Sequence, residues 1–141
     1  MAVSYIAVCF GVKMIKKIDG IVLEDEKEEK KAENSAPDPL AEKFLKTRQI
    51  LLSGEICEEL AEKIIRQLLI LEADNDKPIY IYIDSPGGDV YAGFAIFDTI
   101  RFINAPVYII GTGLIASAAA LILLSVPKER RLGLPHSSYL I

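Results

Sequence analysis

The sequence predicts one α/β domain built on a mostly parallel sheet, and two observations carry this prediction. From about residue 40, stretches with strand patterning alternate with stretches with helical patterning, and the connections between them are short. The strand-like stretches are rich in β-branched residues, as buried parallel strands are. Such an alternation implies right-handed βαβ units. A chain of 141 residues suffices for one such domain and is short for two.

The first elements follow from periodicity. A short helix is predicted from Leu40 to Lys46, and a short strand from Gln49 to Ser53 that ends at Gly54. The segment Glu58–Ala73 is predicted to be an amphipathic helix, because apolar residues recur along one stripe. These residues are Leu60, Ile64, Leu68 and Leu71.

The next strand has a clear period of two. In Ile79–Asp84, isoleucines alternate with tyrosines, so the two residue types are expected on opposite faces of a sheet. The segment Ser85–Asp89 is predicted to be a turn, and Val90–Ile103 a second helix. The isoleucines are Ile79, Ile81 and Ile83, and the tyrosines are Tyr80 and Tyr82.

A strand, a turn and a helix are predicted next. Val107–Ile110 is β-branched and aromatic, Gly111–Gly113 interrupts the run, and Ile115–Val126 is rich in alanine and leucine. Two further short strands are predicted, at Leu132–Leu134 and Tyr139–Ile141.

A membrane span is the alternative for part of this region. No charged residue occurs from Phe102 to Pro127, which is long enough to cross a bilayer. Pro106 and the two glycines of Gly111–Gly113 interrupt the run, which favours a buried strand and helix. We therefore expect no membrane association.

The N-terminal part differs in composition from the rest. Residues 1–12 are apolar, but their lysines come afterwards, which is the reverse of a secretory signal. Residues 24–33 carry six acids and three bases, and residues 34–39 include two prolines. This composition is typical of a solvated linker. We predict an N-terminal arm and linker over 1–39 and a folded domain over 40–141.

Composition excludes several function classes. The net charge is −4, which argues against nucleic-acid binding. Cys9 and Cys57 are too few for a disulfide framework or a cysteine-rich zinc site. Cys57 stands at a helix start, where a thiol can become acidic, but no partner is visible and an inert role is expected. His136 is the single histidine, so mechanisms that need several imidazoles are excluded.

Two predicted turns fall at the carboxyl ends of strands, where ligands bind in open parallel sheets. In the Ser85–Asp89 turn, Gly87 and Gly88 can bring main-chain N–H groups close to an anion, although a tight turn alone needs such glycines. Ser117 stands near the start of the helix predicted after the second turn. A nucleophile there would benefit from the helix dipole. Taken alone, however, Ser117 is better explained as a small residue chosen for close packing, like the alanines around it.

Together, the two turns resemble a known family. The segment 83–93, Ile-Asp-Ser-Pro-Gly-Gly-Asp-Val-Tyr-Ala-Gly, with the helix that follows it, resembles the proteolytic subunit of the ATP-dependent Clp protease. The segment 113–120, Gly-Leu-Ile-Ala-Ser-Ala-Ala-Ala, is similar to the active-serine motif of that family. Leu134-Pro135 and Ser138–Ile141 are similar to the strand that leads to its catalytic histidine. The resemblance runs from about Thr47 to Ile141.

The resemblance implies a serine endopeptidase with a Ser-His-Asp triad on a crotonase-like fold. It makes Ser117 the nucleophile and gives the oxyanion hole to the N–H groups of Gly88 and Ala118. It further implies a cytoplasmic homo-oligomer of two stacked heptameric rings, a tetradecamer that acts in protein quality control. An AAA+ unfoldase would feed it unfolded proteins or peptides. No cofactor or metal is implied.

The same resemblance assigns the remaining triad members. The catalytic histidine would be the residue immediately after Ile141, and the aspartate would come well after it, so the chain would be incomplete at its C-terminal end and inactive alone. His136 is expected in a surface loop, not as the base. Asp84, Asp89 and Ala119 depart from the usual family residues without removing a catalytic group. The resemblance also implies an unfoldase-docking pocket formed by Tyr80, Tyr82, Phe102 and Leu134.

Two other functions remain open from the sequence. A non-catalytic ring subunit could assemble with active paralogues, although it would not need Ser117. An acyl-CoA enzyme of the crotonase-like superfamily also uses paired N–H donors, but it needs no serine at that position.

Overall fold

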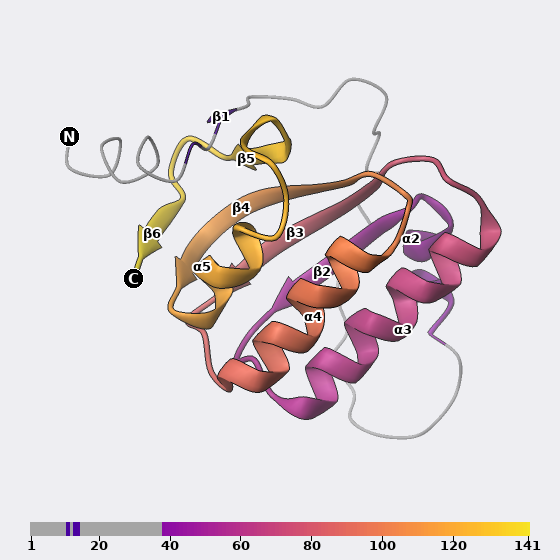
Figure 1. The fold of residues 1–141 in the computed structure, drawn as a ribbon, viewed down its shortest axis with the longest axis horizontal. Coiled ribbons are helices and arrows are strands. Elements are labelled where there is room, and N and C mark those ends of the chain that lie inside the picture. Colours follow the sequence, from indigo (N-terminus) through magenta and orange to yellow (C-terminus); the bar gives the residue numbers. More distant parts are fainter. Residues whose placement is uncertain (1–10, 12, 15–37) are drawn as a thin grey trace.

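A computed structural model describes residues 11, 13–14 and 38–141 of the chain. Its centre is a six-stranded sheet in which every strand pairing is parallel. The strand order is β1-β5-β4-β3-β2, and β6 pairs with β4 beyond the end of β5 (Figure 1). The strands are β1 (Lys13–Met14), β2 (Gln49–Ser53), β3 (Ile79–Ser85), β4 (Val107–Ala116), β5 (Arg131–Gly133) and β6 (Ser138–Leu140).

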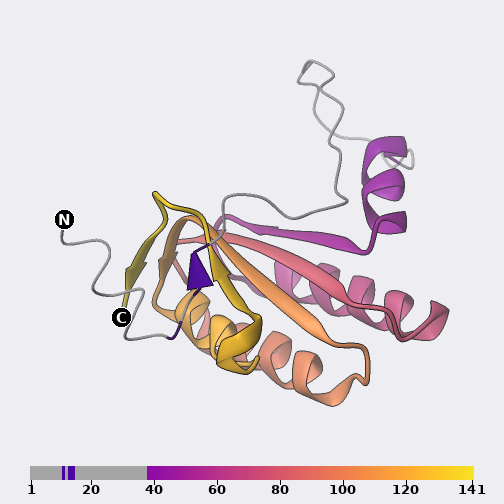
Figure 2. The same ribbon diagram turned by 90° about the horizontal axis from the view of Figure 1, so that it is seen from above.

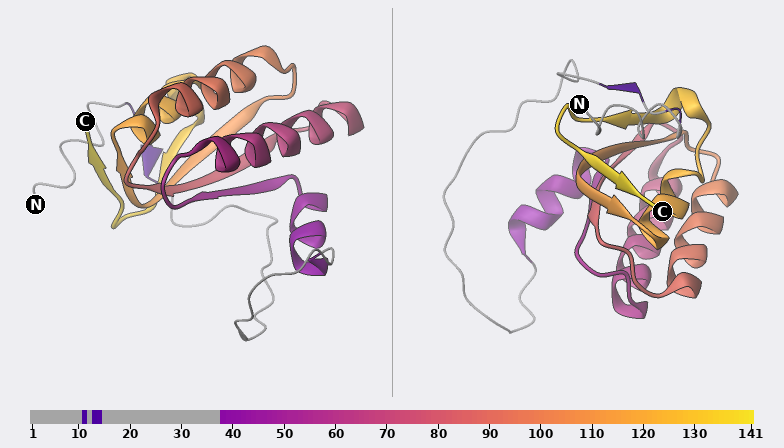
Figure 3. Two further views of the ribbon diagram at one scale, coloured as in Figure 1. Left: turned by 90° about the horizontal axis from the view of Figure 1, so that it is seen from below. Right: turned by 90° about the vertical axis from the view of Figure 1, so that its left-hand side faces the viewer.

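Helices cover one face of this sheet. Figure 2 shows α3, α4 and α5 in one layer, and α2 apart from them near the start of β2. The right-hand view of Figure 3 shows the same separation from the side. The helices are α2 (Pro39–Lys46), α3 (Glu58–Asp74), α4 (Val90–Phe102) and α5 (Ala118–Leu123), with a 3-10 turn η1 (Lys128–Arg130). The α/β class and its parallel sheet are confirmed.

The core lies between the sheet and this helix layer. The three isoleucines of β3 are fully buried, whereas Tyr80 and Tyr82 are half-buried on the opposite face. On α3, Ile64, Leu68 and Leu71 are buried, and Leu60 packs partly buried against the core. The alternation in β3 and the apolar stripe of α3 therefore match the sequence prediction.

The predicted turn at Gly111–Gly113 is wrong. β4 continues through these glycines to Ala116, and α5 begins only at Ala118 and not at Ile115. The pairing of β3 with β4 steps from Ile83 opposite Gly111 to Ser85 opposite Ile115, so the glycines mark a bulge inside one strand. Gly113 has a φ of +60°, a conformation that glycine adopts without steric cost.

Smaller differences concern element ends and the N-terminal region. α5 is shorter than the predicted helix, and β5 and β6 each begin one residue earlier than predicted. β1 lies within the predicted arm and pairs with β5. Cys9 and the charged segment 24–33 lie outside the described residues. Within the part of the chain that the structure describes, no helix combines the length and apolarity needed to cross a membrane.

Glu72 of α3 joins the helix layer to the loop before β4. Its Oε1 accepts from the main-chain N–H and the side-chain amide of Asn104, and its Oε2 accepts from the N–H of Ala105, each at 2.9 Å. These hydrogen bonds, the Ala105 N–H foremost, lower the pKa of Glu72 below its ordinary value. The folded state therefore favours the ionised carboxylate.

We expect Glu72→Gln to lower the free energy of unfolding at neutral pH by about 1–2 kcal/mol, because an amide cannot accept at both positions. A group whose pKa is lowered on folding stabilises the protein fully above its unfolded pKa. That contribution is lost as the pH falls from about 4.5 through the lower folded pKa. Urea unfolding at pH 7 and across this acidic range measures the effect. The free energy of unfolding should fall less steeply with falling pH in the variant than in the wild type.

Glu62 offers a matched control on the same helix. Its carboxylate pairs with Arg66 one turn along the exposed face of α3, where ion pairs contribute little. Glu62→Gln should change stability by less than about 0.5 kcal/mol at either pH. If both variants lost the same free energy of unfolding, the hydrogen bonds of Glu72 to Asn104 and Ala105 would contribute no more to stability than an exposed ion pair.

Candidate active site

Ser117 lies between the end of β4 and the start of α5, and it is exposed. Its backbone has a φ of +53° and a ψ of −121°, which non-glycine residues rarely adopt and which costs about 1–3 kcal/mol. Its N–H donates to the carbonyl of Leu140 at 3.1 Å, and its carbonyl accepts from Ala120 at 2.9 Å. The side chain makes no capping hydrogen bond to α5, so an exposed serine stands on a constrained backbone without being used as a helix cap.

The Gly87–Gly88 turn lies against this serine. A Cβ built on Gly87 would stand 2.8 Å from Ser117 Cβ and 3.1 Å from the nitrogen of Ala118. Both glycines have positive φ, +95° and +149°. Only a residue without a side chain permits the main chain of this turn to approach Ser117 so closely. The structure therefore brings the Gly87–Gly88 turn and Ser117 together.

The peptide group between Gly87 and Gly88 has a defined orientation. The carbonyl of Gly87 accepts from Ile56 at 2.9 Å, and the N–H of Asp89 donates to Ile56 at 2.8 Å. In a trans peptide, the N–H points opposite to the carbonyl. The N–H of Gly88 therefore points away from Ile56 and is not consumed by this pairing. Its orientation is fixed by main-chain hydrogen bonds on either side.

Ala118 is the first residue of α5 and is buried. A Cβ built on Gly93 would stand 3.4 Å from Ala118 Cβ, so α4 and α5 pack closely at this point. The N–H groups of a helix's first turn have no intrahelical partner. A serine hydroxyl next to main-chain N–H donors is the arrangement that acyl transfer to serine requires.

His136 does not join this group. It is exposed, in the turn between β5 and β6, which is closed by the Ser137 N–H on the Leu134 carbonyl at 3.0 Å. β6 runs parallel to β4, with Ser138 opposite Leu114 and Leu140 opposite Ala116. His136 therefore precedes the start of β6, whereas Ser117 lies beside the end of β6. The expected loop position fits this geometry.

Other polar groups support the site from nearby. Asp89 caps α4, because its Oδ1 accepts from Ala92 N at 2.7 Å. Asp84 Oδ1 accepts from Leu114 N at 2.9 Å, inside the β4 bulge. Neither role was predicted from the sequence, although an aspartate directly before a helical pattern is a usable capping signal. Cys57, free and half-buried at the start of α3, makes no capping bond with its side chain.

The predicted docking residues do not converge within one chain. Tyr80 lies on the sheet face that α3–α5 leave uncovered, where its ring stacks on Tyr108 with centroids 5.4 Å apart. Burial raises the pKa of Tyr82 on the same face. Phe102 ends α4, on the helix side, and is 81% exposed. Leu134 is half-buried between β5 and β6.

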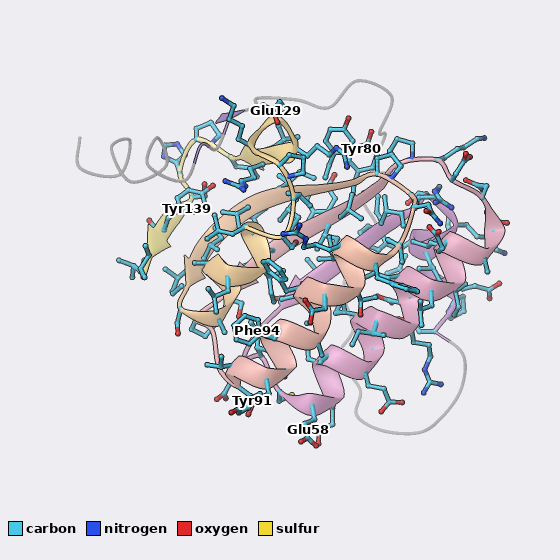
Figure 4. All side chains as sticks on the ribbon, viewed as in Figure 1. Glu58, Tyr80, Tyr91, Phe94, Glu129 and Tyr139 are labelled. Carbon is cyan, nitrogen blue, oxygen red and sulfur yellow. The ribbon has the colours of Figure 1, made fainter. Side chains whose placement is uncertain are left out.

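Tyr139 is a buried residue that the sequence did not single out. It is 2% exposed and lies in β6 opposite Ile115. Figure 4 shows it beside β6, away from Tyr80 at the other end of the sheet. Burial raises the pKa of its phenol above the ordinary value, so the hydroxyl keeps its proton at neutral pH.

Comparisons with known proteins agree with this geometry. The family model described as Clp protease matches residues 30–141. The chain is similar to the ATP-dependent Clp protease proteolytic subunit 2 of Treponema denticola, with 66% identity over 115 residues that cover 81% of this chain and 58% of the relative. It is similar to the subunit of that name from Borreliella burgdorferi, with 50% identity over 98 residues, 69% of this chain and 50% of the relative.

A solved structure gives the same result. ClpP1 from Listeria monocytogenes shares 47% sequence identity and a TM-score of 0.69, over 71% of this chain and 59% of that chain. The chain thus spans between half and three-fifths of the length of the relatives it matches.

Proposed function

This chain belongs to the Clp protease family, and from that premise we propose that it is the proteolytic subunit of a serine-type endopeptidase acting on unfolded proteins or peptides. One observation carries the proposal. Ser117 lies exposed on a strained backbone, against the Gly87–Gly88 turn and the first N–H of α5. That arrangement fits nucleophilic attack on a carbonyl and stabilisation of the oxyanion that results.

The proposed reaction begins at Ser117 Oγ. Its oxygen bonds to the carbonyl carbon of the substrate while its proton passes to a base. The carbonyl π electrons move to the substrate oxygen, and the N–H groups of Gly88 and Ala118 donate hydrogen bonds to the oxyanion that forms. Collapse of the intermediate expels the amine, which takes the proton from the base, and water then releases the acyl group from serine by the same steps.

The base is proposed to be the residue that follows Ile141. The Leu140 carbonyl accepts from Ser117 N–H, so the parallel register of β6 carries the next residues past the nucleophile. A histidine there would lie next to Ser117, whereas His136 lies at the far end of β6. An aspartate further along would orient that histidine. The 141 residues alone are expected to hydrolyse peptides very slowly, because a serine without its base retains only residual catalysis.

The proposal extends to assembly and location. We place the subunit in the cytoplasm, in two stacked heptameric rings that receive unfolded chains from an AAA+ unfoldase. Exposed apolar side chains support burial at an interface: Val90, Tyr91 and Phe94 lie on the first turns of α4, and Phe102 at its end. Tyr91 and Phe94 are labelled in Figure 4. The docking pocket of Tyr80, Tyr82, Phe102 and Leu134 would then combine residues from neighbouring subunits.

Covalent labelling tests this function. The chain is expressed from its gene with whatever residues the reading frame adds after Ile141, and is treated with a fluorophosphonate. Mass spectrometry of a digest should place a single adduct on Ser117, and peptide hydrolysis should fall in step with labelling. A well-folded protein with no adduct would contradict a catalytic role and favour a non-catalytic ring subunit. Size measurement of the same sample tests the tetradecamer.

A further inference from the structure

Tyr139 and Gly111 fit together across neighbouring strands. A Cβ built on Gly111 would stand 2.5 Å from Tyr139 Oη and 3.1 Å from its Cζ. The head of the phenol therefore occupies the space that a side chain on Gly111 would need. The same Cβ would stand 3.0 Å from Ile115 Cδ1, so the ring is enclosed along β4. The Tyr139 ring therefore packs directly against the main chain of β4 at Gly111.

A polar contact fixes the other side of the ring. Ser137 is 1% exposed, and its Oγ lies 2.9 Å from Tyr139 Oη and 2.8 Å from the Leu134 carbonyl oxygen. A serine hydroxyl has one proton, and a carbonyl can only accept. The single serine proton is therefore shared between the phenol oxygen of Tyr139 and the Leu134 carbonyl, and both lie within hydrogen-bond distance of Ser137 Oγ. This chain of hydrogen bonds ties Tyr139 to the turn that precedes β6.

β6 in turn constrains the nucleophile. It is three residues long and pairs with β4, and its Leu140 carbonyl accepts from Ser117 N–H at 3.1 Å. A serine with φ of +53° keeps that conformation only when its surroundings impose it. The next residue after Tyr139 therefore supplies one of the contacts that impose it.

We propose that Tyr139, seated over Gly111, is a positioning residue that fixes the register of β6 and thereby holds Ser117 in its reactive conformation. This inference rests on the proposed function of Ser117 as a nucleophile. It assigns no contact between Tyr139 and the substrate. Tyr139 acts on Ser117 through the main-chain carbonyl of Leu140, which accepts from the Ser117 N–H.

The test uses variants of the full reading frame and the fluorophosphonate reaction, resolved into the inactivation rate kinact and the binding constant KI. Gly111→Ala should displace Tyr139 and lower kinact by about 30-fold or more, since misplacement by about 1 Å can cost 100-fold. KI should stay within about 2-fold, because the probe's contacts are unchanged. Tyr139→Phe alone keeps the ring and should lower kinact by about 3-fold.

The double variant separates positioning from general damage. Gly111→Ala with Tyr139→Phe removes the 2.5 Å contact and leaves the milder ones, 3.0 Å to Ile115 Cδ1 and 3.1 Å to Cζ of residue 139. Its kinact should recover at least about 3-fold over Gly111→Ala, since contacting residues are non-additive. Tyr108→Phe removes a hydroxyl from the same strand on the uncovered face and should change nothing.

The outcomes distinguish a failure of the Tyr139 inference from a failure of the proposed function of Ser117. An unlabelled wild-type protein would defeat the proposed function itself. A labelled wild type with folded Gly111→Ala at the wild-type kinact would overturn the role of Tyr139 alone, as would a double variant no faster than Gly111→Ala. If Gly111→Ala does not fold, Tyr139→Leu removes the ring without adding bulk. That variant should lose about 10-fold in kinact, and an unchanged kinact would overturn the inference.

Discussion

Ser117→Ala is expected to abolish fluorophosphonate labelling and to reduce peptide hydrolysis by the full reading frame by about 10⁴-fold or more. The substitution removes the only atom that can form the acyl bond. It leaves the Leu140 hydrogen bond in place, because that bond uses the main-chain N–H of residue 117. Circular dichroism and thermal unfolding should therefore stay close to wild type while both activities disappear. Gel fluorescence and initial rates on a fluorogenic peptide provide the measurement.

Ser53→Ala is the matched control. Ser53 ends β2 and is exposed, so its loss should leave labelling and hydrolysis at wild-type levels. Labelling that survives in Ser117→Ala would remove this residue from the nucleophile's role. Loss of labelling in both variants would point to damage to the fold instead.

Gly88→Ala is expected to cost both reactivity and stability. A Cβ at this position would stand 2.2 Å from the Ile56 carbonyl oxygen and 2.8 Å from its nitrogen, at a φ of +149°. The turn must shift, because the obstructing atoms are main chain. Displacing one oxyanion donor should lower kcat by about 10²–10³-fold. The lost Ile56 pairing and the backbone strain should lower the free energy of unfolding by about 2–4 kcal/mol.

Gly54→Ala separates the two causes of that loss. Gly54 also has a positive φ, +87°, but a Cβ there meets nothing within 4 Å. Its substitution should cost about 1 kcal/mol of stability and leave kcat unchanged. Chemical denaturation and peptide kinetics on both variants make the comparison. A Gly88→Ala protein with wild-type kcat would show that this N–H does not contact the oxyanion.

Local patterns were sufficient for most of the fold. The alternation in β3 and the apolar stripe on α3 can be read from residues close together in the sequence. Burial of one face imposes a period of two residues on a strand and of 3.6 residues on a helix. The continuation of β4 through Gly111 and Gly113 was not predictable in this way. Gly111 is required by Tyr139 of another strand, and a Cβ on Gly113 would stand 2.6 Å from Asp84 Oδ1. A local reading assigns such glycines to a turn.

Arg48 shows the same limit more strongly. It is 8% exposed, has a φ of +60°, and reaches residues far along the chain. Its guanidinium donates to Leu71 and Asn75 carbonyls at 3.0 Å and to Lys77 at 2.7 Å, which closes the C-terminal end of α3. Nothing near residue 48 in the sequence indicates this role, because its partners become neighbours only in the folded sheet.

Neither residue spacing alone nor the resemblance to a family was enough to describe the candidate site. Spacing alone favoured a tight turn at Gly87–Gly88 and a packing role for Ser117, and only the combined resemblance joined them. The structure supplies what neither could, the 2.8 Å approach of a Gly87 Cβ to Ser117 Cβ and the positive φ of the serine. Both depend on how β3 and β4 end beside each other in three dimensions.

The attachment of β6 to the end of β4 has a consequence for synthesis. β2, β3 and β4 can pair as soon as they leave the ribosome, whereas the Leu140 carbonyl that holds Ser117 is made about twenty residues after the serine. At typical elongation rates, that interval is roughly 1–5 s. A nascent chain therefore carries its serine for seconds before the backbone around it is set. The backbone contact that holds Ser117 therefore forms only after β2, β3 and β4 have been made.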